Sequence, residues 1–131
     1  MREILFRGKS TDTGAWVYGY YCGSFGDFDE HEICDIADPT CSRVDVDPET
    51  VGQYTGLTDK NGKQIFEGDI VRGRDALEKG LVVEGYIDHQ YGSFCIVGDL
   101  ITHFRWMDYE VEVIGNVHDN PLLIGGKEDG T

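Results

Sequence analysis

The four cysteines are the side chains in this sequence that could bind a metal, form disulfides or act as nucleophiles. They are Cys22, Cys34, Cys41 and Cys95, and no Cys-x-x-Cys pair occurs. Their spacing, with His31 included, is too irregular for a zinc finger or zinc ribbon, so we predict no metal site. No secretory segment opens the chain, which favours reduced thiols. We expect most of these cysteines to pack as small buried hydrophobes.

Histidines and carboxylates offer other routes to catalysis. His103 has no Ser or Cys neighbour that suggests a nucleophile pair, although His89, His103 or His118 could approach Asp or Cys in the fold. Nine carboxylates against Arg43 alone occupy residues 23–49. A general acid–base pair needs apolar surroundings that raise one pKa, whereas this segment reads as solvated. We predict that the chain is not an enzyme, and a site assembled only in three dimensions is kept as an alternative.

A calcium loop and a phosphate loop are both predicted to be absent. Asp59, Asn61 and Gly62 superficially resemble an EF-hand loop. Aligning Gly62 with the invariant glycine of that loop puts Leu57 at the first ligand position and Gly68 where a bidentate Glu belongs. The glycines of the chain are scattered, and none opens a long helix as the dinucleotide-binding motif requires. Turn chemistry therefore explains these residues, and no cofactor is predicted.

A contact site is predicted at Glu67, Asp69 and Arg72, because loops on a rigid scaffold usually carry the binding residues. Gly68 lets the backbone bend sharply, which would point both carboxylates outward and close together. Two like charges at close range are costly unless a cation or a basic partner relieves them. The alternative is that Asp69 only accepts hydrogen bonds from the turn backbone, as Asp often does.

The overall charge limits the partners. The chain has 25 acidic and 11 basic residues, a formal net charge of −14. This charge argues against nucleic acid, whose phosphates need Lys and Arg, and against an anionic membrane surface. A protein with a basic surface remains as a partner, and a homo-oligomer is left open. No apolar run approaches the ~18 residues that span a bilayer, so we expect a cytoplasmic protein.

The elements that must position these residues are short strands. Asn61-Gly62 lies between two alternating runs and predicts a hairpin with a type I′ turn, in which both central residues have positive φ. In Ala15–Tyr21, aromatic residues occupy both faces; core packing is favoured over a platform for stacking bases or sugars. Asp75–Lys79 is the one plausible helix. The other expected strands cover residues 3–6, 31–36, 42–46, 51–57, 65–66, 70–72, 81–87, 93–97, 100–106 and 109–117.

Many short strands with Gly-rich turns predict a mostly β fold with little helix. The strands are expected to be antiparallel and to form a small barrel or two tightly packed sheets. At 131 residues the chain fits one domain, residues 1–131. Its acidic region covers residues 23–49, and residues 125–131 form a flexible tail.

Three blocks of the sequence resemble a known family. Thr50–Val71 (TVGQYTGLTDKNGKQIFEGDIV) is similar to the signature of the YopX-like proteins of phages and prophages. Arg2–Lys9 with Gly14–Gly19, and Val111–Leu123, resemble its other two blocks. The resemblance implies a mostly β fold and a phage or prophage accessory protein, but no activity and no catalytic residue. Together with the acidic surface it favours a non-enzymatic protein-binding module, with an acidic decoy that imitates nucleic acid as the alternative.

Overall fold

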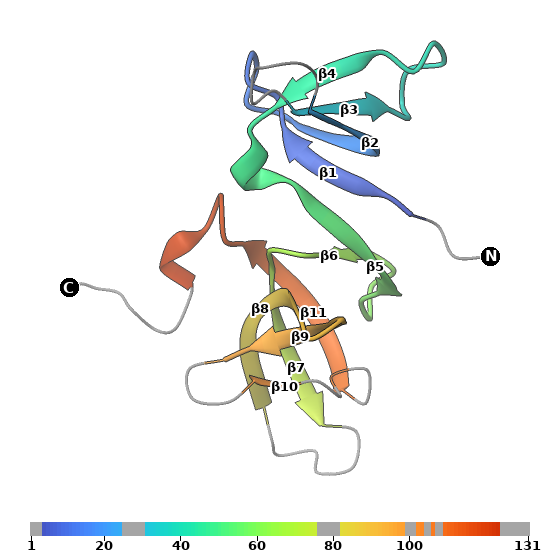
Figure 1. The fold of residues 1–131 in the computed structure, drawn as a ribbon. Coiled ribbons are helices and arrows are strands. Elements are labelled where there is room, and N and C mark those ends of the chain that lie inside the picture. Colours follow the sequence, from blue (N-terminus) through green and yellow to red (C-terminus); the bar gives the residue numbers. More distant parts are fainter. Residues whose placement is uncertain are drawn as a thin grey trace. The chain divides into compact units, whose positions relative to one another are not determined.

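The computed structural model in Figure 1 describes residues 4–24, 31–75, 82–98, 102–103, 106 and 109–123. The chain divides into two compact units, residues 1–56 and 57–131. Each unit has a hydrophobic core of its own. That the two units form a single domain over residues 1–131 stays a prediction.

The first unit is an antiparallel sheet with the strand order β4-β3-β2-β1-β5. Its elements are β1 (Phe6–Lys9), β2 (Trp16–Ser24), β3 (His31–Asp35), β4 (Arg43–Val46), the 3₁₀ turn η1 (Pro48–Thr50) and β5 (Gly52–Thr58). Asp47 caps the start of η1, because its carboxylate accepts a hydrogen bond from the Glu49 amide and Pro48 follows it at the first position of the turn. The first strand lies three residues later than the expected strand over residues 3–6.

The core of the first unit lies on one face of this sheet. Val17, Ile33 and Val46 are buried there, because alternate residues of a strand point to the same face. The sheet is strongly curved, since β4 returns to the end of β1, where Ser10 bridges Val46. A Cβ atom on Gly8 would lie 3.0 Å from the Cβ of Val46, so glycine leaves the space that this close approach needs.

The second unit holds a five-stranded antiparallel sheet with the order β10-β9-β8-β7-β11. Its elements are β6 (Gln64–Phe66), β7 (Asp69–Asp75), β8 (Val82–Gln90), β9 (Ser93–Val97), β10 (Thr102–His103), β11 (Tyr109–Asn116) and the 3₁₀ turn η3 (Pro121–Leu123). Strand β6 pairs with the end of β5. The core of this unit contains Ile65, Val71, Val83, Ile87, Ile96, Trp106 and Val111.

The mostly β, antiparallel fold is confirmed. Of the two predicted arrangements, the structure has two sheets, and neither sheet closes into a barrel within the residues that are described. The predicted helix at Asp75–Lys79 falls largely outside the described residues: Asp75 ends β7, and residues 76–79 are not described.

The hairpin at Asn61-Gly62 is present, but its turn is not type I′. Gly62 has a φ of 82°, whereas Asn61 is not in the positive region. The Asp59 amide donates to the Lys63 carbonyl at 2.7 Å, and the Gly62 amide donates to the Asp59 carbonyl at 2.9 Å. The loop therefore has three residues, a type I turn followed by a left-handed glycine. Positive φ at both central residues occurs instead in the β8–β9 hairpin, at Tyr91 (53°) and Gly92 (80°).

We expect Gly62→Val to lower the free energy of unfolding by about 1–2 kcal/mol, because a β-branched residue is strained at positive φ. Apart from the adjacent residues of the chain, no atom lies within 4 Å of the place where its Cβ would be, so the effect comes from the backbone conformation. Urea unfolding measures the change. Gly62→Asn is the matched control, since Asn tolerates this conformation, and equal stability of the two variants would contradict the turn assignment.

Candidate functional site

Asp69, one of the three predicted contact residues, is inside the second unit. Its side chain is only 1% exposed, and its carboxylate accepts a hydrogen bond from the Phe66 amide at 2.8 Å. Gly68 makes the predicted sharp bend with a φ of 93°, and its amide donates to the Ile87 carbonyl. The expectation that both carboxylates point outward is therefore wrong for Asp69, whose carboxylate is buried and bonded to the turn backbone.

Glu67 and Arg72, the other two residues, lie nearer the surface. Glu67 is half-buried. Arg72 is exposed, and its Nε donates to the Glu84 carboxylate at 2.7 Å. The structure does not bring the three residues together as one exposed cluster, and a binding role for Glu67 or Arg72 stays a prediction.

Asp59 accepts hydrogen bonds from three backbone amides, whereas the sequence analysis treated it only as part of a turn. One carboxylate oxygen accepts from the Asn61 and Lys63 amides at 2.8 and 2.9 Å, and the other accepts from the Val113 amide at 3.0 Å. Burial acts to raise the pKa of Asp59, but the hydrogen bonds from Val113, Lys63 and Asn61 outweigh it and hold the pKa below its ordinary value. Asp59 therefore fixes the hairpin to the edge of β11 and is structural.

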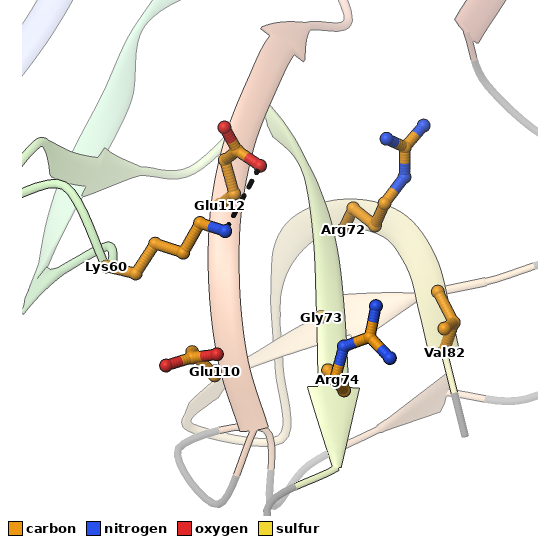
Figure 2. Close-up of a pocket in the computed structure, with 7 residues that line it drawn as sticks. All are labelled: Lys60, Arg72, Gly73, Arg74, Val82, Glu110 and Glu112. Carbon is orange, nitrogen blue, oxygen red and sulfur yellow. Dashed lines mark ion pairs between the residues drawn. The ribbon is translucent and has the colours of Figure 1, made fainter. Parts of the chain in front are cut away.

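Arg72 lines a groove on the exposed face of the second sheet. The groove encloses about 250 Å³ and is lined by Lys60, Arg72, Gly73, Arg74, Val82, Glu110 and Glu112; we call it the arginine groove. Figure 2 shows the arginine side chains on the side of β7 towards Val82, whereas Lys60, Glu110 and Glu112 lie on the other side. Lys60 Nζ lies 3.8 Å from the Glu112 carboxylate. Sequence reasoning found Arg72 but missed this grouping, because it depends on pairing between distant strands.

The first unit exposes aromatic residues on the face opposite its core. Tyr18 and Tyr20 alternate along β2, and Ile36 lies beside Tyr18, whose carbonyl accepts from the Ile36 amide. All three are exposed, and Tyr20 is 55% exposed. We call these three residues the tyrosine face. The expectation of core packing is therefore wrong for the two tyrosines.

Trp16, on the same side of β2, is already in contact with cations. The Arg7 guanidinium carbon lies 4.5 Å from the ring centroid, and Lys9 Nζ lies 5.5 Å from it. These distances are typical of cation–π contacts. The indole ring is half-buried, so the outward aromatic surface of β2 comes mainly from Tyr18 and Tyr20.

The cysteines differ from the expectation of buried, reduced thiols. Cys34 and Cys41 form a disulfide that closes the β3–β4 hairpin, so that expectation is wrong for this pair. Cys95 alone is fully buried, and Cys22 is half-buried. Burial raises the pKa of the Cys95 thiol, and the charge of Asp88 adds to the effect, which makes a poor nucleophile at neutral pH.

Metal ligands do not gather in the part of the chain that the structure describes. No three His, Cys, Asp or Glu side chains there are placed to hold a metal ion. His31 stacks on Tyr21 and its Nδ1 is hydrogen-bonded to the Tyr21 hydroxyl, whereas His89 packs edge-on against Phe94. These contacts join His31 to a tyrosine hydroxyl and His89 to an aromatic ring. In the described residues, no helix has the length and apolar character to cross a membrane.

Comparison with known proteins identifies a family but no individual relative. No curated protein is similar enough to this chain to count as a relative. The YopX protein family matches residues 5–125, which covers most of both units, two of the three blocks that carry the resemblance and most of the first block. Because the match covers most of the sequence, the chain belongs to the YopX protein family.

Proposed function

We propose that this chain is a non-enzymatic, phage- or prophage-type accessory module that binds a protein through the tyrosine face. The observation that carries the proposal is the shared exposure of Tyr18 and Tyr20 on β2 and of Ile36 just after the end of β3. Tyrosine is enriched among the residues that dominate binding energy at protein interfaces, since it buries a large apolar ring at a small cost in side-chain entropy.

The rigidity of this face supports its use as a binding surface. Tyr20 lies directly opposite Cys34, whose disulfide to Cys41 closes the hairpin next to it. In the same hairpin loop, the Asp38 carboxylate accepts hydrogen bonds from the Ser42 hydroxyl and from the amide and hydroxyl of Thr40. These bonds hold the loop together and lower the pKa of Asp38 to about 2. A preorganised surface loses little conformational entropy on binding, which favours affinity.

The net charge of −14 favours a partner with a basic surface. Opposite charges accelerate association and select among partners more than they add affinity. In this proposal the acidic surface attracts the partner and the tyrosine face holds it. The decoy alternative differs, because there the carboxylates themselves would supply most of the binding energy.

We expect Tyr20→Ala to weaken binding of the partner at least tenfold and to leave the fold intact. The partner is first captured from bacterial lysate on the immobilised chain, then purified and titrated by calorimetry. Tyr91→Ala is the matched control, because Tyr91 is 94% exposed in the β8–β9 turn of the other unit.

The dependence of the affinity on salt concentration distinguishes this proposal from the decoy alternative. A complex held by the tyrosine face should weaken only modestly between 50 and 300 mM salt, whereas contacts between charges should weaken steeply. Equal affinity of the Tyr20→Ala variant and the wild type, with a steep dependence on salt, would reject the tyrosine face and favour the decoy.

A further inference from the structure

We infer that the arginine groove of the second unit binds a small oxyanion, a carboxylate or phosphate group, between Arg72 and Arg74. The two arginines are two residues apart on β7, so both leave the same face of the sheet. Gly73 between them faces the core, where it lies opposite Val83 and Val111. The backbone that carries both guanidinium groups is paired with a neighbouring strand on each side, which fixes their spacing.

The strand register distributes charge unevenly across the groove. Arg72 lies opposite Glu84 on β8 and Glu112 on β11. Arg74 lies opposite Glu110 on β11, but its neighbour on β8 is the apolar Val82. Among the described residues of β8, the carboxylate in register with these two arginines is that of Glu84, opposite Arg72. The β8 side is where Figure 2 shows both arginine side chains.

The contact between Arg72 and Glu84 leaves part of the guanidinium available. The Glu84 carboxylate accepts from Nε of Arg72 at 2.7 Å. Among the described residues no hydrogen bond to the terminal nitrogens of Arg72 is formed, so the Nε contact orients the guanidinium plane while the terminal N–H groups can still donate. Arg presents several N–H donors in a planar fork that matches a carboxylate or phosphate.

The ion pairs around the groove are weak enough for an anion to compete. Arg72 and Glu84 are both about half exposed, as are Lys60 and Glu112, whose charged atoms are 3.8 Å apart. Exposed ion pairs of this kind contribute little to the stability of the fold, because water and salt screen their charges. Glu110 and Glu112 line the opposite side of the groove and repel an anion there, so the β8 side is the expected place.

The size of the groove limits the ligand. A volume of about 250 Å³ is below the range of pockets that hold drug-sized molecules, about 300–1,000 Å³. An oxyanion on a small molecule fits this space, whereas a large ligand would extend into solvent. Because the whole chain is strongly acidic, long-range attraction does not favour anions, and recognition must come from these short-range hydrogen bonds.

The test is a titration of the full chain with inorganic phosphate, and separately with malonate, at constant ionic strength. The NMR signals of the arginine Nε–H groups and of the Gly73 amide report binding. We expect saturable shifts, affinity at least tenfold weaker in Arg74→Gln and in Arg72→Gln, and tighter binding in Glu84→Gln. The probe that binds with the higher affinity identifies which oxyanion the site prefers.

Arg43→Gln is the matched control. Arg43 is an exposed arginine in the first unit, 3.8 Å from Glu32, and its removal changes the net charge equally. Shifts that grow linearly without saturation, or that weaken equally in Arg43→Gln, would show only general salt effects and overturn the proposal. The result is independent of the tyrosine face, since Tyr20→Ala should leave these shifts unchanged.

Discussion

Replacement of Asp59 by alanine is expected to lower the free energy of unfolding by about 3 kcal/mol, the largest effect among the changes that we propose. The carboxylate is 7% exposed and accepts from three backbone amides. Its loss leaves the amides of Asn61, Lys63 and Val113 without this acceptor. These bonds are part-buried, and a donor that loses its acceptor away from water contributes its desolvation penalty.

Asp59→Asn separates the bonds within the hairpin from the bond to β11. Its remaining carbonyl oxygen can still accept from Asn61 and Lys63, but its amino group would face the Val113 amide, and two donors repel each other. We therefore expect an intermediate loss of about 1–2 kcal/mol. Urea unfolding measures both variants. Asp12→Ala, a change in an exposed loop of the other unit, should be nearly neutral.

The same residue predicts a dependence on pH. The pKa of Asp59 in the folded chain lies below its ordinary value, so the unfolded chain binds a proton first as the pH falls. The stabilisation is fully present above the unfolded pKa of about 3.9 and is lost as the pH falls through the folded pKa. The difference in stability between wild type and Asp59→Ala should therefore be largest near pH 7 and shrink below about pH 4. A difference that stays constant from pH 7 to pH 3 would contradict the role of the ionised carboxylate.

The strands could largely be predicted from local sequence, because alternation and turn residues are local signals. The run Val111-Glu112-Val113 alternates, and the structure buries Val111 in the core while Glu112 lines the arginine groove. The type of turn at Asn61-Gly62 was harder to predict. It depends on where pairing resumes, and the bond from Asp59 to Lys63 makes the loop one residue longer than a type I′ turn allows.

The candidate sites could be predicted only in part, since they arise from pairing between distant segments. The alternation around Gly73 places Arg72 and Arg74 on one face, but nothing local says that Glu110 and Glu112 of β11 lie opposite them. The exposure of Tyr18 and Tyr20 was missed for a related reason. Aromatic residues on both faces of a strand suggest burial, and only the tertiary fold determines which face is covered.

Asp69→Ala is expected to lower the free energy of unfolding by about 2 kcal/mol and to leave binding of a partner unchanged. The Phe66 amide would lose its acceptor inside the second unit, where Phe66 and Asp69 are both buried. A surface contact residue would behave in the opposite way, with stability retained and binding lost.

Asp69→Asn is the conservative variant, because its carbonyl oxygen can still accept from the Phe66 amide. It should therefore recover much of the lost stability. Glu67→Ala, two residues away and half-buried, is the matched control and should be less destabilising. Urea unfolding together with calorimetric titration of the captured partner decides between the two roles. An Asp69→Ala protein with wild-type stability and no binding would show that Asp69 contacts the partner. Lost stability with full binding would show that its carboxylate stabilises the turn between β6 and β7.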